Sequence, residues 1–277
     1  MPRRSVLFTP GDQHDMLMGA LDSAADVVVF DLEDGVSTDD TPTARETIVE
    51  VLTAVETASV EVLIRLNPPE VGAQEDLEVL KALTTGSFPD GFVLPKVNAP
   101  STVDAYRRHI EAAGFDTELW CLLESPAGVL DARAIADESG VSTLVFGGED
   151  YIAAVGGIRT RANTELLYAR QRTVAAAAAA GIIAIDGITS ALEDIERVRS
   201  DATEAATFGF DGKLAIHPAQ LDPINEAFTP DAEQVEWARR VIEAVEASDA
   251  GVLRVDGEMI DAPLIKRARR ILDIADG

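Results

Sequence analysis

The sequence predicts an α/β fold, a closed (β/α)8 TIM barrel with a C-terminal appendage of helices and a hairpin. Short apolar runs bounded by turn residues alternate with longer helical stretches. Successive runs lie roughly thirty residues apart, about the length of one strand, one helix and two loops. Several runs are apolar at almost every position, which is typical of parallel strands buried on both faces. Eight such runs occur, at residues 5–8, 27–30, 60–66, 91–94, 119–123, 143–146, 182–185 and 213–216.

The segments between and after these runs have the features of helices. Residues 164–180, for example, include an alanine tract of high helix propensity. Beyond the eighth run, residues 231–247 and 263–274 are expected to be helical. Asp256-Gly257 lies between these two helices and is a typical hairpin turn.

The length of the chain allows one large domain with a sizeable core. Its 277 residues are 47% hydrophobic and 26% charged, a composition typical of globular proteins. We expect a catalytic barrel domain over residues 1–228 and an appendage over residues 229–277. A hinge near residues 247–251 would join the two predicted helices of the appendage.

The charge of the chain argues against two classes of partner. Asp and Glu number 49 against 23 Lys and Arg, a formal net charge of −26 that repels nucleic-acid backbones and anionic membranes. The acids are spread along the chain, so we interpret them as the solvated surface of a halophilic protein. The single cysteine, Cys121, cannot form an internal disulfide, and no stretch approaches about 18 consecutive apolar residues. We therefore expect a cytoplasmic protein without nucleic-acid or membrane partners.

Reactive or conformationally special residues follow every apolar run. The carboxyl ends of the strands carry the active site in (β/α)8 barrels, so we expect these residues to form one site. The acidic members are Asp31, Glu33, Glu124, Glu149, Asp150 and Asp186. Carboxylates are hard oxygen ligands, and the sequence has no Cys/His cluster with zinc spacing, so Mg2+, or Mn2+, is the expected ion. Glu124 and Asp150 follow adjacent runs and form the best ligand pair; the other expected role of Asp34, Glu149 and Asp186 is to cap helices.

Two further features point to a ligand that carries negative charge. Arg65 lies inside the apolar third run, and a guanidinium at the rim of a barrel needs an anionic partner. We favour a ligand oxyanion over a protein carboxylate as that partner. Gly147 and Gly148 precede Glu149 and let the backbone approach a ligand closely, and amide N–H groups there can bind a carboxylate.

Eight sequence blocks are spread in order over essentially the whole chain. They comprise residues 4–11, 31–34, 64–68, 94–97, 124–128, 146–150, 212–220 and 259–263. Together they resemble the citrate lyase β-subunit-like family of the HpcH/HpaI aldolase superfamily, to which malyl-CoA and citramalyl-CoA lyases belong. The resemblance implies a magnesium-dependent (β/α)8 enzyme that cleaves a carbon–carbon bond in a 3-hydroxyacyl-CoA and gives acetyl-CoA and a 2-oxoacid. It also implies a homotrimer or a dimer of trimers, with the appendage packing on a neighbouring subunit.

The resemblance further implies roles for single residues of the barrel. Glu124 and Asp150 would be the metal ligands, and Glu124 would also contact the substrate. Arg65 would bind the substrate and its developing oxyanion. Gly148 and Glu149 would donate backbone hydrogen bonds to the carboxylate of the 2-oxoacid.

Asp261 has two candidate roles. The resemblance implies a catalytic acid/base that reaches from the appendage into a neighbouring subunit's site. The residues themselves indicate a helix N-cap, because Ala262-Pro263 follows and proline is favoured in a first helical turn. Both roles are compatible with each other.

The region expected to bind coenzyme A departs from the family. Many relatives carry basic residues after the segment that corresponds to residues 10–12, whereas residues 13–15 here are Gln, His and Asp. The candidate coenzyme contacts are Phe8, Lys96 and His217, with Arg3 and Arg4 as further sources of positive charge.

Three other functions remain open. A thioesterase would hydrolyse the same thioester with a metal-bound water. A carrier-dependent citrate lyase subunit would act only with its partner subunits. A Schiff-base aldolase would use Lys96 or Lys213, both of which lie near strands.

Overall fold

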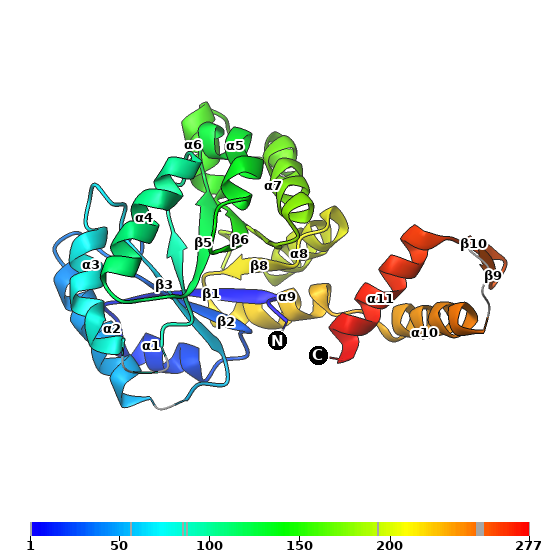
Figure 1. Cartoon of the computed structure of the whole chain (residues 1–277), viewed down its shortest axis with the longest axis horizontal. Helices are drawn as coiled ribbons and strands as arrows, with labels where there is room; N and C mark the ends of the chain where they lie inside the picture. Colours follow the sequence, from blue (N-terminus) through cyan, green and yellow to red (C-terminus); the bar gives the residue numbers. More distant parts are fainter. Residues whose placement is uncertain are drawn as a thin grey trace.

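Eight parallel strands close into a barrel in the computed structural model of the chain (Figure 1). The structure describes residues 2–55, 57–84, 86, 88–192, 194–247 and 252–276. The strands are β1 (Ser5–Pro10), β2 (Val27–Asp31), β3 (Glu61–Arg65), β4 (Gly91–Leu94), β5 (Glu118–Leu123), β6 (Val141–Phe146), β7 (Ile183–Asp186) and β8 (Gly212–Ala215). They pair in sequence order, and β8 closes the barrel on β1. Each strand overlaps one of the predicted apolar runs, so the predicted (β/α)8 barrel is confirmed.

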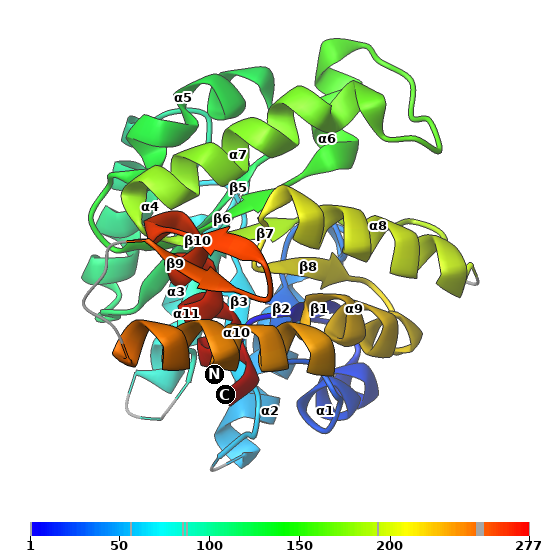
Figure 2. The ribbon, with the colours of Figure 1, turned by 90° about the vertical axis from the view of Figure 1, so that its right-hand side faces the viewer.

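Helices surround the barrel (Figures 1 and 2). They are α1 (His14–Leu21), α2 (Thr41–Ala54), α3 (Ala73–Leu80), α4 (Pro100–Ala112), α5 (Pro126–Ala136), α6 (Gly148–Val155), α7 (Leu167–Ala180), α8 (Ile195–Phe208) and α9 (Leu221–Phe228), with 3-10 turns η1 (Lys81–Leu83), η2 (Thr164–Leu166) and η3 (Pro218–Gln220). The helix predicted at 164–180 is divided into η2 and α7, and Gly181 ends α7 with a left-handed φ of 74°. Within the described ranges, no helix has the length and apolar character needed to cross a bilayer.

The strands separate two layers of apolar core, which explains why their sequences are so uniformly apolar. Val27 and Val29 of β2 belong to the cluster inside the barrel. Val28 and Phe30 of the same strand belong to the larger cluster between the strands and the helices. Successive side chains of a strand point to opposite faces, so both faces of β2 are buried. The same alternation fixes which residue at the end of each strand faces the barrel axis.

The C-terminal arm consists of α10 (Ala232–Glu246), the antiparallel pair β9 (Leu253–Val255) and β10 (Glu258–Ile260), and α11 (Ala262–Asp276). Asp256 and Gly257 both have positive φ in the turn between β9 and β10, which confirms the predicted hairpin. A small core of its own holds the arm together, and its centre is Ala238, Val241, Val255, Ile260 and Ala268. The predicted hinge at 247–251 lies outside the described residues except for Ala247.

The arm projects from the side of the barrel where the strands begin (Figures 1 and 2). Arg270 of α11 donates a hydrogen bond of 2.7 Å to Asp211, which directly precedes β8. Arg4, which precedes β1, donates one of 2.8 Å to Thr229. The arm is therefore attached at the base of the barrel, by which we mean the end where the strands begin. Packing of the arm on a neighbouring subunit stays a prediction.

Candidate active site

The alternation of the strands carries charged residues into the mouth of the barrel, the end where the strands finish. Val29, Leu63 and Leu122 belong to the cluster inside the barrel. Two residues beyond each of them stand Asp31, Arg65 and Glu124, which therefore face the same way. They line a pocket of about 320 Å³. Its other lining residues are Phe8, Thr9, Pro10, Asp34, Gly35, Leu122, Gly147, Glu149, Asp150, Ile188, Leu214 and Ile216.

Glu124 and Asp150, the predicted metal ligands, meet around Lys96. Glu124 is 5% exposed, and its Oε1 accepts a hydrogen bond of 2.6 Å from the backbone N–H of Lys96. Asp150, in the first turn of α6, accepts one of 2.6 Å from the Lys96 ammonium, which also lies 3.6 Å from Glu124 Oε1. Gly147 lets the start of α6 lie close to Glu124. Any other residue would place its Cβ only 2.5 Å from the Cβ of Glu124, which is a steric clash.

Burial controls the ionisation of this pair. It raises the pKa of Glu124 to about 8, although the Lys96 ammonium acts in the opposite direction. Burial acts on Asp150 as well, but there the hydrogen bond from Lys96 prevails and lowers the pKa. Even with Lys96 beside it, the Glu124 carboxyl is therefore hard to ionise, and a further positive charge in the pocket would favour its carboxylate form.

The Glu124 and Asp150 carboxylates fit a hard divalent ion. One is buried at the wall of the pocket and the other is half-exposed at its rim. Mg2+ is typically bound by one or two carboxylates, with water and substrate oxygens completing its coordination. In the part of the chain that the structure describes, no group of three His, Cys, Asp or Glu side chains is arranged to hold a metal. A site with two protein ligands and open positions is thus the arrangement that these residues allow.

Arg65 has protein partners, and our expectation that its partner is a ligand oxyanion is wrong in that respect. Its Nε and Nη2 donate to the two oxygens of Asp31 at 2.6 Å each, and its Nη1 lies 2.8 Å from Glu33. The guanidinium carbon lies 5.1 Å from the centre of the Phe8 ring. Burial opposes the charge, but Asp31 and Glu33 raise the pKa of Arg65 above its usual value. A guanidinium has five N–H groups, so these three contacts leave donors for a ligand in the pocket that Arg65 lines.

Asp31 orients Arg65, a role that the sequence did not indicate. It is 3% exposed and also accepts hydrogen bonds from the backbone N–H groups of Glu33 and Gly35, at 2.9 and 2.8 Å. A Cβ at position 35 would lie 2.3 Å from an Asp31 oxygen, so the turn requires glycine. The prediction that Asp31 offers an oxygen ligand is wrong, because both of its oxygens accept hydrogen bonds from these donors.

Asp186 and Lys213 lie outside the pocket, behind the wall of the barrel. Lys213 Nζ is 3.0 Å from Asp186, and Arg170 of α7 also donates to this carboxylate at 3.0 Å. Both residues are buried, and neither lines the pocket. The expectation that Asp186 joins the acids of the site is therefore wrong, and a Schiff base on Lys213 is excluded by its position in this buried ion pair.

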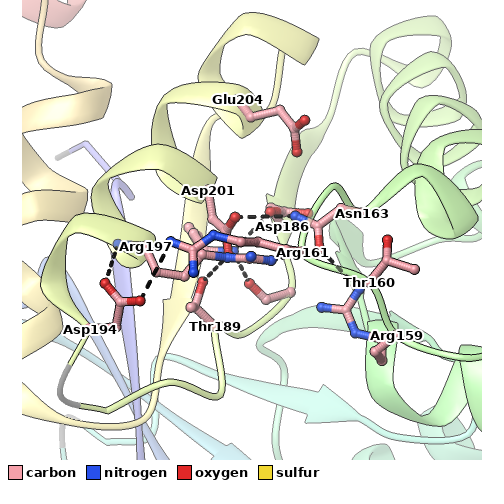
Figure 3. A network of polar contacts seen from close by, with 12 residues as sticks. Arg159, Thr160, Arg161, Asn163, Asp186, Thr189, Asp194, Arg197, Asp201 and Glu204 are labelled. Atoms are coloured by element: carbon pink, nitrogen blue, oxygen red, sulfur yellow. Dashed lines mark hydrogen bonds and ion pairs between the residues drawn. The ribbon is translucent and has the colours of Figure 1, made fainter.

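A polar network fixes the segment that follows α6 (Figure 3). Arg159 donates to Glu149 at 3.0 Å and to Asn163 at 3.1 Å. Asn163 donates to Asp201 of α8 at 3.1 Å, and Thr189, which follows β7, donates to the same carboxylate at 2.9 Å. The network thus holds the Glu149 side chain at the pocket rim. The predicted backbone donors, Gly148 and Glu149, begin α6, where amide N–H groups lack partners within the helix.

The candidate coenzyme contacts are divided between the two ends of the barrel. Phe8 lines the pocket, and His217 is exposed beyond the end of β8, where its Nδ1 accepts a hydrogen bond of 3.1 Å from Ala219. Arg3 and Arg4 precede β1 and so lie at the base of the barrel, where they pair with Glu61, Glu118 and Asp26. The suggestion that Arg3 and Arg4 supply charge to this site is therefore wrong.

Asp261 lies outside the pocket of its own chain. It directly precedes α11, and its carbonyl accepts a hydrogen bond of 3.0 Å from the backbone N–H of Ile265. The arm that carries it projects from the base (Figure 1). The pocket is instead lined by residues at the mouth. One chain alone therefore does not bring Asp261 to Arg65 and Glu124.

The sequence is similar to known proteins over nearly its whole length. The family model described as HpcH/HpaI aldolase/citrate lyase matches residues 4–218. Mitochondrial citramalyl-CoA lyase of Homo sapiens is 31% identical over 294 aligned positions, which cover 99% of this chain and 86% of that protein. Citrate lyase subunit beta of Escherichia coli K12 is 33% identical, with 99% of this chain and 93% of that protein covered.

The fold is similar to solved structures as well. CitE from Mycobacterium tuberculosis, in complex with magnesium, acetoacetate and coenzyme A, has a TM-score of 0.83 and 30% sequence identity to this chain. The match covers 100% of this chain and 99% of that one. Because the family model spans most of the sequence and both relatives exceed 30% identity, the chain belongs to the HpcH/HpaI aldolase/citrate lyase family.

Proposed function

We propose that the chain is a magnesium-dependent carbon–carbon lyase. It cleaves a 3-hydroxyacyl-CoA such as malyl-CoA or citramalyl-CoA and gives acetyl-CoA and a 2-oxoacid. The supporting observation is that one pocket holds the Glu124 and Asp150 pair together with the buried Arg65. The similarity to human citramalyl-CoA lyase supports the reaction, and the magnesium and coenzyme A in the related CitE structure support the cofactor and the substrate class.

Glu124 and Asp150 would hold the divalent ion. When bound, such an ion polarises the oxygens of the 2-oxoacid portion and neutralises their charge. Manganese has the same preference for carboxylate ligands and is a second candidate. The amides of Gly148 and Glu149 at the start of α6 would bind the carboxylate of the 2-oxoacid, because a helix N-terminus favours anions.

Arg65 would face the thioester oxygen. In the cleavage the 3-hydroxyl loses its proton to solvent and becomes the carbonyl of the 2-oxoacid, while the electron pair of the carbon–carbon bond moves into an enolate next to the thioester oxygen. The remaining guanidinium N–H groups can donate to that oxygen. Asp31 and Glu33 fix the guanidinium before substrate arrives, so little reorganisation is needed during the reaction. Phe8 packs against the same guanidinium and, with Lys96 and His217, remains a candidate for coenzyme contacts.

Asp261 would deliver the proton that converts the enolate into acetyl-CoA. In the condensation direction it would remove that proton. Since Asp261 is absent from the pocket of its own chain, we propose that a neighbouring subunit supplies it. The arm would pack on that subunit in a homotrimer or a dimer of trimers.

A product assay tests the proposal. Malyl-CoA or citramalyl-CoA is incubated with the full chain and MgCl2, and acetyl-CoA together with glyoxylate or pyruvate is the expected outcome. Malate or citramalate together with free coenzyme A would instead identify a thioesterase. Turnover that appears only with an acyl-carrier partner would identify a citrate lyase subunit, the activity named for the Escherichia coli relative.

A further inference from the structure

Lys96 is held in an unusual backbone conformation at the mouth of the barrel. It follows β4 and Pro95, and its φ is 54°. A side chain with a Cβ disfavours this left-handed region. The backbone N–H of Lys96 nevertheless donates to Glu124 at 2.6 Å, so the turn is tied to a carboxylate of the pocket.

The ammonium group of Lys96 lies among four carboxylates. Nζ is 2.6 Å from Asp150 Oδ2 and 3.6 Å from Glu124 Oε1. It also lies 3.4 Å from Glu33 Oε1 and 3.4 Å from Asp34 Oδ2. The Lys96 side chain is 37% exposed, so its flexible stem has room to change rotamer.

Positive charge is unevenly distributed over these four acids. Arg65 Nη1 contacts Glu33 at 2.8 Å and lies 3.9 Å from Asp34. In the described part of the chain, the ion pairs of Glu124 and Asp150 are formed with Lys96 alone. Two of the acids therefore have a second cation beside them, whereas the proposed metal ligands depend on one lysine.

We propose that Lys96 is an internal counter-ion that holds Glu124 and Asp150 in place in the metal-free protein and competes with the divalent ion for them. This inference rests on the proposed metal site. An ammonium at contact distance from Asp150 and a dication on the same carboxylate would repel each other strongly. Glu33 and Asp34 also lie 3.4 Å from Nζ, so the ammonium retains two carboxylate partners when it releases Asp150.

The arrangement has two consequences for the pocket. The ligand carboxylates stay together before the ion arrives, so binding requires little rearrangement of Glu124. Displacement of an ammonium also weakens the apparent affinity for the ion. Lys96 is thus a positioning residue whose removal should strengthen magnesium binding, the opposite of what removal of a ligand does.

Metal binding to EDTA-treated, dialysed full-length protein tests this role. Isothermal titration with MgCl2 should give a dissociation constant for Lys96→Met that is about tenfold or more below that of the wild type, because a like charge is removed beside the ion. Lys96→Arg keeps the charge and should bind Mg2+ much like the wild type. Lys81→Met removes a lysine that pairs with Glu78 on the outer surface, and as the matched control it should leave the affinity unchanged.

Thermal unfolding gives a second readout that does not depend on activity. Without metal, Lys96→Met should melt about 2–4 °C below the wild type, since four carboxylates lose a shared cation. Saturating MgCl2 should raise its melting temperature by more than it raises that of the wild type. Lys96→Gln provides another neutral side chain if Lys96→Met does not fold.

The outcomes separate this inference from the metal site on which it rests. If Glu124→Gln abolishes Mg2+ binding while the neutral Lys96 variants bind no more tightly than the wild type, the site stands and the role of Lys96 is wrong. If the wild type and Glu124→Gln both fail to bind Mg2+ in the titration, the metal site is wrong and the role of Lys96 falls with it.

Discussion

The two ends of the barrel carry nearly the same cluster of side chains. At the mouth, Arg65 lies between Asp31 and Glu33, with its guanidinium carbon 5.1 Å from the centre of the Phe8 ring. At the base, Arg3 lies between Glu61 and Glu118, 5.0 Å from the centre of a Trp120 ring. Each cluster therefore consists of one arginine, two carboxylates and one aromatic ring.

The ends differ in the acids that surround the cluster. At the base, Glu118 also accepts a hydrogen bond of 2.8 Å from Ser142, and Asp90 accepts one of 2.7 Å from the backbone of Val62. At the mouth, Glu124 and Asp150 share Lys96 beside an open pocket. An arginine between two carboxylates is thus no sign of function by itself. A neighbouring pocket is no sign of function by itself either, since Arg3, Glu61 and Asp90 line one at the base. The informative feature is the further pair of carboxylates at the mouth, Glu124 and Asp150, which share a single lysine ammonium.

The largest expected effect comes from removal of a ligand carboxylate at the mouth. Glu124→Ala or Asp150→Ala should lower magnesium-dependent turnover by ~10³-fold or more, because a bound metal contributes several kcal/mol to the transition state. Glu61→Ala, which removes an acid at the base, is the matched control and should keep its turnover per folded molecule. Steady-state assays with MgCl2 and with EDTA measure the difference. Unchanged magnesium dependence in both mouth variants would contradict the proposed site.

Removal of the proposed acid/base on the arm should rank next. Asp261→Asn should lower turnover by ~10²–10⁴-fold, since general acid–base catalysis contributes about that much. Asp256→Asn, in the hairpin turn of the same arm, is its control and should keep full activity. Asp261→Asn protein mixed with Arg65→Ala protein should regain activity, because a hybrid assembly contains one intact site. No recovery after verified subunit exchange would show that the arm does not complete a neighbour's pocket.

The two arginines offer a direct test of the contrast between mouth and base. Arg65→Ala should lower turnover by ~10²–10³-fold, as loss of other oxyanion donors does. Arg65→Lys should be little better, because an ammonium cannot form the two parallel bonds to Asp31. Arg3→Ala should instead lower the melting temperature and retain turnover. Rate assays and thermal unfolding of the three variants check this prediction. A similar loss of turnover in Arg3→Ala would contradict the claim that only the arginine at the mouth acts in catalysis.

Salt should have the smallest effect and should act mainly through the surface. The net charge is −26, and molar KCl shortens the range of repulsion between exposed acids to about 3 Å. We expect both melting temperature and activity to rise from dilute buffer to molar KCl. The buried Arg65–Asp31 pair is screened less than the surface, so Arg65→Ala should show the same trend. Highest activity in dilute buffer would contradict the halophilic interpretation.

The alternation of strand residues explains which acids the sequence placed correctly. Asp31 stands two residues after Val29, which faces the barrel axis, and Asp31 lines the pocket. Asp186 stands one residue after Ile185, which also faces the axis, and Asp186 is turned toward the helices. An even number of residues after an axis-facing side chain places a carboxylate inside the barrel, and an odd number places it outside. This rule assigns Asp31 to the pocket and Asp186 to the helical side. Their shared position at a strand end is therefore not enough to place both in one site.

Other features of the site could not be read from local sequence. Arg3 and Arg4 lie at the base because residues before a strand stand at the opposite end of the barrel from residues after it, whereas the predicted coenzyme site lies at the mouth. The position of the Lys96 ammonium depends on a left-handed turn and on acids from three other segments of the chain. Closure of the barrel brings these four segments together. The strand pattern predicts the closed barrel but not the contacts between individual side chains at its mouth.

The attachment of the arm at the base has a consequence for how the protein responds to its own concentration. Its internal core is small, and the carboxylate of Asp261 lies apart from the pocket of the chain that carries it. If each site is completed by another copy, specific activity should fall when the protein is diluted until assemblies dissociate, even though every barrel stays folded. The concentration of the protein in the cell would then determine both the number of active sites and the fraction of them that a neighbouring subunit completes.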